Sequence, residues 1–222
     1  MANKLKVQET EQKSFATKVA DFLVKNKLAV IISAAALVVV IVLVVVLTSV
    51  ASSSKEKAMI RLDSLETRCL RLSAKDKSDA DYVETANELI ADLEKETGKK
   101  GYVSTKATYL IGKVLYDCGS YSDAYDWFMK VYENSPEVYL SGLSLLNAAV
   151  CKESLSDLNG ALDAYKLASE YDIVKPQALF NAGRIYYLQN NMALAKASFQ
   201  SVVDLMGDSE YKALSQNILV TL

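Results

Sequence analysis

Residues 105–137 read TKATYLIGKVLYDCGSYSDAYDWFMKVYENSPE, and this stretch predicts two helices joined by a tight turn. A glycine in the first helix allows close helix packing, and Gly119 stands where that helix must end. On the second helix an alanine and an aromatic residue lie one turn apart, and a proline closes the unit eight residues later. The four residues that define the unit are Gly112, Ala124, Phe128 and Pro136.

The same spacing recurs twice downstream. In each copy the alanine follows the first residue of the set by twelve positions. The aromatic position follows the alanine by four, and the closing position follows the aromatic one by eight. The second copy has Ala149, Ala161, Tyr165 and Ile173, and the third has Gly183, Ala195, Phe199 and Gly207. A fixed period of this size is typical of stacked repeat proteins, so we predict three helix pairs packed in series.

The composition favours an all-α fold. The 222 residues include 2 prolines and 8 glycines, too few for the tight turns of an all-β protein. The three cysteines form no CxxC pair, and we interpret Cys69, Cys118 and Cys151 as small apolar core residues.

The residue types that carry catalysis are largely missing. The chain has no histidine, so the commonest general base and zinc ligand are absent from its sequence. We find no phosphate-binding loop, no metal-ligand cluster and no nucleophile beside a base. We therefore predict no enzyme activity and no cofactor.

The charge distribution argues against nucleic acid as a partner. Residues 1–54 carry six lysines and three acidic residues, a total of +3. The remaining 19 basic and 24 acidic residues give −5, because the whole chain has 25 and 27. Phosphate backbones require clustered Lys and Arg, and an acidic repeat domain lacks such a stripe.

Residues 1–27 are predicted to form a polar tail followed by a short basic amphipathic helix. Phe15, Val19, Phe22 and Leu23 recur at helical spacing with lysines between them. Such a helix suits an anionic membrane surface. The other interpretation is that the lysines are the positive flank of a membrane span.

Residues 28–50 are uncharged and consist almost wholly of Val, Ile, Leu and Ala. At about 1.5 Å per residue they form a helix of roughly 34 Å, enough to cross a hydrocarbon core of about 30 Å. We predict a retained transmembrane helix. A cleaved signal peptide is the alternative, because Ser49-Val50-Ala51 resembles a processing site, although the apolar block is long and follows an unusually long head.

The flanking charges do not decide the orientation of this span. Four basic residues lie in the 15 positions before it, and four lie in the 15 positions after Ser54. Because the short head is easier to leave in the cytoplasm, we predict a cytoplasmic N-terminus and repeats on the extracytoplasmic, periplasmic side of the inner membrane. Cytoplasmic repeats are the alternative.

Helical segments are predicted on both sides of the repeats. Residues 51–101 should form a juxtamembrane helix and a helical hairpin, which could be a degenerate repeat, and residues 209–222 should form a closing helix. The expected core positions of the hairpin are Ala58, Leu62, Leu65, Cys69 and Leu72 on its first helix and Val83, Ala86, Ile90 and Leu93 on its second, which should begin near Ala80. The closing helix should bury Tyr211, Leu214 and Ile218.

The repeats resemble the tetratricopeptide repeat family between Thr105 and Asp208, within the predicted domain 102–208. The second helices carry the resemblance through the segments AYDWF, ALDAY and AKASF, each with Ala followed four residues later by an aromatic. The first helices depart from the family pattern, since Thr108 stands where a Trp is expected. The overall layout resembles that of YfgM-like single-span membrane-anchored repeat proteins of bacterial envelopes.

The resemblance implies that the first helices of the repeats line a concave groove for protein or peptide partners. The residues predicted to face it are Tyr109, Lys113 and Tyr116, then Leu146, Val150 and Glu153, then Phe180, Arg184 and Tyr187. Aromatic side chains interleaved with basic ones suit a peptide ligand. An alternative is that several of these rings belong to the core between repeats. A dedicated carboxylate clamp is not expected, because only Lys113 and Arg184 offer positive charge.

Two functions follow from this interpretation. The first is a membrane-anchored adaptor or scaffold that binds other proteins, with the YfgM-like layout implying an accessory to protein translocation or a chaperone-like role in the envelope. The second is a structural subunit of a large envelope assembly that stacks its repeats on copies of itself or on other subunits. The sequence does not determine the oligomeric state.

Overall fold

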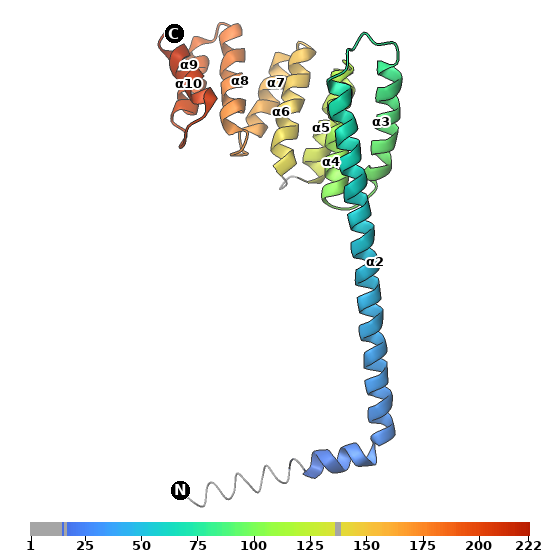
Figure 1. The fold of residues 1–222 in the computed structure, drawn as a ribbon. Helices are drawn as coiled ribbons and strands as arrows, with labels where there is room; N and C mark the ends of the chain where they lie inside the picture. Colours follow the sequence, from blue (N-terminus) through green and yellow to red (C-terminus); the bar gives the residue numbers. More distant parts are fainter. Residues whose placement is uncertain (1–14, 16, 136–138) are drawn as a thin grey trace, which may run out of the picture. The chain divides into compact units, whose positions relative to one another are not determined.

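The computed structural model describes residues 15, 17–135 and 139–222, and all secondary structure in these residues is helical (Figure 1). The chain divides into two compact units, the described part of Met1–Lys57 and Ala58–Leu222. The helices are α2 (Lys27–Ser73), α3 (Tyr82–Thr97), α4 (Tyr102–Asp117), α5 (Tyr121–Asn134), α6 (Tyr139–Ser154), α7 (Leu158–Ala168), α8 (Lys175–Leu188), α9 (Met192–Val203) and α10 (Glu210–Leu219). The predicted all-α fold class is confirmed.

The first unit is a helical segment with an exposed apolar surface. Residues 17–25 are helical, a turn follows at Asn26, and α2 begins at Lys27. Every side chain from Leu37 to Leu47 is more than half exposed, although all are apolar. In the described residues α2 is the one helix long and apolar enough to cross a membrane, with a mean hydropathy of 3.5 in its most apolar window. The expected polar tail and Lys13 lie outside the described residues.

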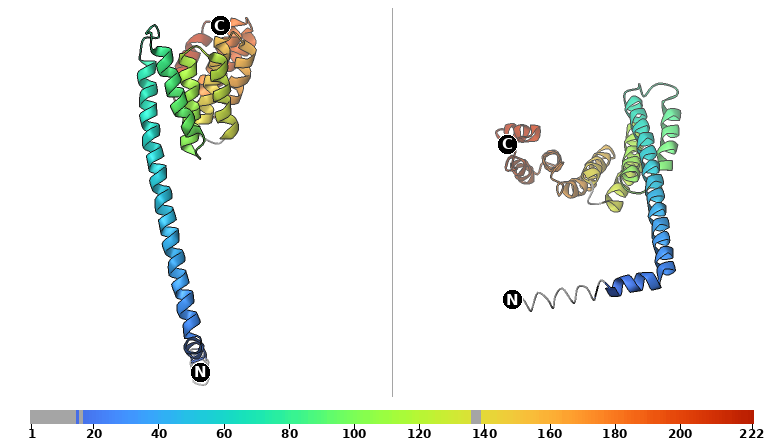
Figure 2. Two further views of the ribbon diagram at one scale, coloured as in Figure 1. Left: turned by 90° about the vertical axis from the view of Figure 1, so that its right-hand side faces the viewer. Right: turned by 60° about the horizontal axis from the view of Figure 1, so that its bottom comes forward.

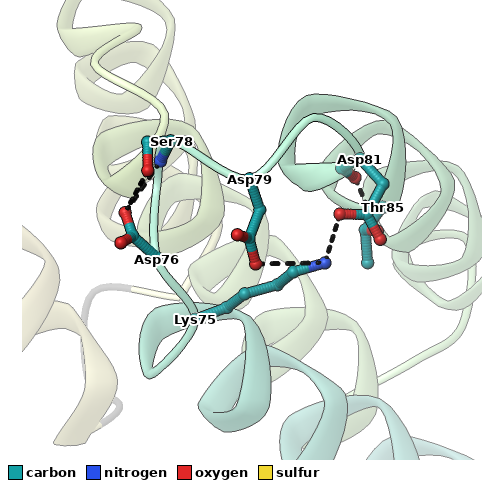
Figure 3. Close-up of polar contacts among 6 residues, drawn as sticks. All are labelled: Lys75, Asp76, Ser78, Asp79, Asp81 and Thr85. Carbon is teal, nitrogen blue, oxygen red and sulfur yellow. Dashed lines mark hydrogen bonds and ion pairs between the residues drawn. The ribbon is translucent and has the colours of Figure 1, made fainter.

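The second unit begins with the last part of α2 and a polar loop that connects it to α3. Lys75 forms ion pairs with Asp81 at 2.6 Å and with Asp79 at 3.9 Å across this loop (Figure 3). Asp76 accepts hydrogen bonds from the backbone and the hydroxyl of Ser78, which lower the pKa of Asp76 below its usual value. These local contacts hold the chain reversal that the polar stretch predicts.

The buried face of α3 differs from the predicted face. The helix begins at Tyr82, and the Tyr82 ring is buried in the core. The next residue, Val83, which was predicted to be a core position, is 61% exposed. Ile90, another predicted core position, is only partly buried. The buried positions of α3 are Tyr82, Ala86, Leu89, Leu93 and Glu96. The apolar ones share one core with the five predicted α2 positions and with α4.

Three helix pairs follow in chain order: α4 with α5, α6 with α7, and α8 with α9 (Figures 1 and 2). Within this series each helix packs against the next, and the first helices α4 and α6 also contact one another. Each pair therefore buries its apolar face against its neighbours, as stacked repeats do. Together the pairs form a solenoid with a continuous series of small cores.

Glycine and aromatic residues set the spacing within the first and third pairs. A Cβ atom on Gly112 would lie 2.8 Å from the ring of Phe128, and one on Gly183 would lie 3.0 Å from the ring of Phe199. Both rings are 1% exposed. The absent side chain lets the ring rest directly on the facing helix. The second pair uses Ala149 with Tyr165, and the fully buried Ala124, Ala161 and Ala195 complete the contacts.

The ends of the pairs also follow the sequence signals. Gly119 ends the first helix of the first pair with φ of 81°, and Gly207 follows α9 with φ of 87°, both in the left-handed region that favours glycine. Pro136, predicted to close the first unit, lies outside the described residues. Ile173, at the corresponding place in the second copy, is 61% exposed.

The closing helix α10 packs on α9 and α8 but buries a different set of side chains from the predicted one. Leu214 is 46% exposed, and Ser215 is fully buried in its place. Tyr211 and Ile218 are partly buried, as predicted. The helix therefore meets the repeats through the face that carries Tyr211 and Ile218, with the small Ser215 in place of Leu214 at its centre.

Candidate functional site

A pocket of about 290 Å³ opens between the first helices of the first two repeats. We call it the first-repeat pocket. Its lining comes from α4, α5 and α6 and consists of Tyr109, Lys113, Tyr116, Asp117, Phe128, Asn147 and Val150. Four of these, Tyr109, Lys113, Tyr116 and Val150, are predicted groove residues. The structure therefore brings nearly half of the predicted groove together at one place.

Aromatic rings and one amide form the rigid wall of this pocket. The rings of Tyr109 and Phe128 are tilted against each other with centroids 5.6 Å apart. The Asn147 Nδ2 donates a hydrogen bond to the Tyr109 hydroxyl at 3.0 Å, across from α6 to α4. Burial raises the pKa of Tyr109, so its hydroxyl stays protonated at neutral pH. The wall is thus fixed before any ligand arrives, which lowers the entropy cost of binding.

The lysine at the mouth of the pocket, unlike the aromatic wall, is not held by contacts within the described chain. Lys113 is exposed and makes no ion pair with any described residue. By contrast, Lys152 on α6 pairs with Asp157 at 3.1 Å and lies 4.5 Å from the centre of the Tyr125 ring. Asp117, one turn after Lys113, accepts a hydrogen bond from Ser73. Lys113 is therefore the cation at this pocket with its charge available to a partner.

A second pocket, of about 310 Å³, lies between the third repeat and the closing helix. We call it the third-repeat pocket. Three predicted groove residues, Phe180, Arg184 and Tyr187, line it. The rest of the lining is Phe199 of α9 together with Ile218, Thr221 and Leu222. The ring of Phe180 lies between those of Phe199 and Tyr211, 5.5 Å from each. The Phe180 ring therefore packs against two neighbouring rings as well as lining the pocket.

Glu153 and Arg184, both predicted to face a ligand, bind each other instead. Arg184 Nη2 donates to Glu153 Oε2, which joins α8 to α6. The Tyr165 hydroxyl donates to Glu153 Oε1 at 2.6 Å. Burial, followed by the neighbouring Glu153, raises the pKa of Tyr165 far above its usual value. The cluster holds the second and third repeats together, so the charge of Arg184 is not available for an acidic ligand.

Leu146 does not line either pocket. Its side chain is 5% exposed and belongs to the core of the second repeat, so its groove assignment is wrong. The reason is the rotation of α6, which turns the next residue, Asn147, toward the first repeat. Sequence reasoning missed Asn147 and Asp117. The single amide within the otherwise apolar stretch LSLLNAAV was the available signal for Asn147.

The three cysteines are free thiols in the structure. Cys69 and Cys151 are buried, and burial raises the pKa of Cys69 to about 11 and that of Cys151 to about 12. Cys118 is half-buried, and its pKa is raised for the same reason. The thiols are therefore protonated at neutral pH and pack as small apolar groups.

Comparison with protein families matches residues 176–205 to the tetratricopeptide repeat. This segment covers most of α8 and α9, the third predicted repeat. Among curated proteins no match is found. The family match is therefore confined to one repeat of the predicted three.

Solved structures extend the similarity to nearly three quarters of the chain. The apo form of RapI has a TM-score of 0.56 and 18% identity over 73% of this chain, which spans only 47% of the RapI chain. A putative kinesin light chain of Podosopora anserina with nearly identical TPR-like repeats has a TM-score of 0.56 and 14% identity, covering 72% of this chain and 84% of that one. A single-residue variant of that light chain gives the same values. At these identities the comparison shows a shared tetratricopeptide-like fold.

Proposed function

We propose that this protein is a non-catalytic adaptor that is anchored in a membrane and binds a segment of another protein in the first-repeat pocket. The observation that carries the proposal is the pocket itself, in which a fixed aromatic wall lies beside the unpaired Lys113. The tetratricopeptide-like fold supports it, because such repeats generally serve as scaffolds for protein interaction.

The pocket defines the chemistry of the partner segment. A volume of about 290 Å³ suits one large apolar side chain, and aromatic anchors in such pockets commonly dominate binding energy. Lys113 at the mouth favours an acidic group next to that anchor. The partner segment therefore carries a Leu or an aromatic side chain with an Asp, a Glu or a free carboxylate close by.

The membrane anchor in this proposal is the apolar part of α2. Its side chains are exposed over the whole apolar segment, which in water would be costly, whereas in lipid the same surface is favourable. We place the anchor in the inner membrane with the repeats on the periplasmic side, because the short N-terminal head is easier to retain. The layout resembles that of YfgM-like proteins and supports a role beside protein translocation or envelope chaperoning. Confinement to the bilayer raises the effective concentration of the pocket toward other membrane proteins.

Co-purification in mild detergent tests the adaptor function. The wild-type full chain should retain a partner that the Lys113→Glu variant loses, because the reversed charge repels the acidic group. Lys166→Glu on the exposed side of α7 is the matched control with the same charge change and should retain the partner. Equal recovery of every bound protein by all three forms would rule out the pocket as the binding site.

Protease treatment of intact spheroplasts tests the orientation. Repeats on the periplasmic side should be cleaved without lysis of the cell. Cleavage only after the membrane is permeabilised would place the repeats in the cytoplasm and overturn the envelope role. The side of the membrane also restricts the list of partners.

A further inference from the structure

The first-repeat and third-repeat pockets are built in the same way at equivalent positions of their repeats. In the first, the Tyr109 ring lies against the Phe128 ring with centroids 5.6 Å apart. In the third, the Phe180 ring lies against the Phe199 ring with centroids 5.5 Å apart. Both rings of each pair line their pocket, and the two volumes are about 290 and 310 Å³. The third-repeat pocket is therefore a second copy of the first, two repeats further along the solenoid.

The charges at the two pockets differ. Lys113 and Arg184 hold the same position, one residue after the glycine of their repeat. Lys113 makes no ion pair with any described residue, whereas Arg184 is bound by Glu153. Arg184 is also the one charged side chain in the described lining of the third-repeat pocket. This lining is therefore neutral in effect and suits an apolar side chain that has no acidic neighbour.

The second repeat fills the position that the other two leave open. Leu146 stands where the other repeats have Tyr109 and Phe180, and it is 5% exposed in the core of its own repeat. The Tyr165 hydroxyl donates to Glu153 at 2.6 Å, so the polar groups of this repeat are also occupied. A partner segment that crosses the three repeats therefore meets two pockets, one at each end.

Helix packing sets the distance between the two pockets. The helices α4 and α6 are in contact, as are α8 and α10, and the Glu153–Arg184 pair joins α6 to α8. Packed helices lie about 8–10 Å apart, so two such steps separate the pockets by about 16–20 Å. An extended chain advances about 3.3 Å per residue and covers this distance with about five or six residues.

We propose that the third-repeat pocket is a second binding site for the same partner segment, which it holds by a Leu, a Met or an aromatic side chain about five or six residues from the first anchor. This assignment rests on the proposed function and deepens it, because it adds a second required side chain to the partner. The acidic group of the segment lies beside the first anchor, since Lys113 is the unpaired cation. Charge therefore fixes the direction of the segment, and two anchors on one chain raise its affinity.

Photo-crosslinking of the full chain in intact cells tests the second anchor. A photoreactive phenylalanine analogue replaces Lys113 in one form, Tyr187 in a second and Tyr102 in a third. Tyr187 lines the third-repeat pocket and is 49% exposed. Tyr102 is the matched control, because it is 51% exposed at the start of α4 and lines neither pocket. Mass spectrometry of the adducts locates the attached residues of the partner.

Positions 113 and 187 should capture one partner segment at residues about five or six positions apart, and position 102 should capture none of it. A labelled synthetic peptide of the segment captured from position 113 then serves as the probe in fluorescence anisotropy with the purified full chain in mild detergent. Tyr187→Ala should weaken peptide binding about tenfold, as the loss of an aromatic anchor commonly does. Tyr187→Phe and Tyr102→Ala should both bind as wild type does, because the pocket uses the ring and not the hydroxyl.

The failure of this proposal differs from the failure of the proposed function. An adduct from position 113 without one from position 187 defeats only the second anchor, and so does capture of different proteins or of distant segments from the two positions. Equal peptide binding by Tyr187→Ala and Tyr102→Ala has the same meaning. An adduct from position 187 alone defeats the proposed function at the first-repeat pocket and the two-anchor arrangement with it.

Discussion

Replacing Gly112 with Ala tests the packing of the first repeat at its closest contact. The added Cβ would lie 2.8, 2.9 and 3.1 Å from three ring atoms of Phe128, whereas carbon atoms normally rest about 3.5–4.0 Å apart. The ring has little room to withdraw, because it is 1% exposed and lies against Tyr109 on another side. Either the ring or the α4–α5 spacing must therefore shift.

Two opposing effects set the magnitude. Overpacking of this kind costs about 1–3 kcal/mol. Alanine in a helix interior recovers about 0.5–1 kcal/mol relative to glycine, mainly by restricting the unfolded chain. We expect a net loss of about 1.5 kcal/mol in the free energy of unfolding, the overpacking cost less the alanine gain. In a domain of this size that loss lowers Tm by roughly 3–6 °C.

Gly98→Ala is the matched control. Gly98 follows α3 with φ of −74°, and a Cβ there would meet no atom within 4 Å. The same chemical change should therefore stabilise the protein by about 0.4–1 kcal/mol. Thermal and urea unfolding followed by circular dichroism, in the same detergent for all three forms, gives the comparison. A Gly112→Ala variant as stable as Gly98→Ala would refute the account of close glycine–ring packing.

Three further predictions concern charges and thiols. Glu153→Ala should lower the free energy of unfolding by about 1–3 kcal/mol, because it leaves the buried Tyr165 hydroxyl without its acceptor, and adding Tyr165→Phe should recover part of that loss in a double-mutant cycle of urea unfolding. The pKa of Asp92 is lowered by Lys95 and Arg68, so its stabilising contribution is present above the unfolded Asp pKa of about 3.9 and is lost as the pH falls through the lower folded value; acid unfolding curves of Asp92→Asn should therefore show a smaller loss of stability in that window. Alkylation followed by mass spectrometry should modify the half-buried Cys118 first and Cys69 and Cys151 only on unfolding, and rapid native labelling of Cys151 would contradict its burial.

The repeat architecture is readable from the sequence because few residues control it. Gly112, Gly119, Ala124 and Phe128 each meet a steric requirement that hardly any other residue type satisfies, and the structure places each in the expected role. The same holds for Gly183 and Phe199 in the third repeat. Such local constraints can be recognised in a single sequence without any knowledge of tertiary structure.

The groove was harder to predict because it depends on helix rotation. A shift of one residue along α6 exchanges Leu146 for Asn147 at the pocket, and Ser215 takes the place of Leu214 where α10 meets the repeats. Spacing alone does not resolve such rotations in helices that are apolar on most sides. The ion pair between Glu153 and Arg184 could not be predicted from the sequence either, because the two residues are far apart along the chain. Both were therefore assigned to the groove although they neutralise each other.

Site-specific photo-crosslinking in intact cells tests the central claim most directly, that the first-repeat pocket binds another protein. A photoreactive residue replaces Lys113 at the pocket mouth in one form of the full chain and Lys166 on α7 in the control form. We expect a discrete adduct with a different protein from position 113 and none from position 166. No adduct at position 113, equal adducts at both positions, or an adduct only with a second copy of this chain would contradict the account.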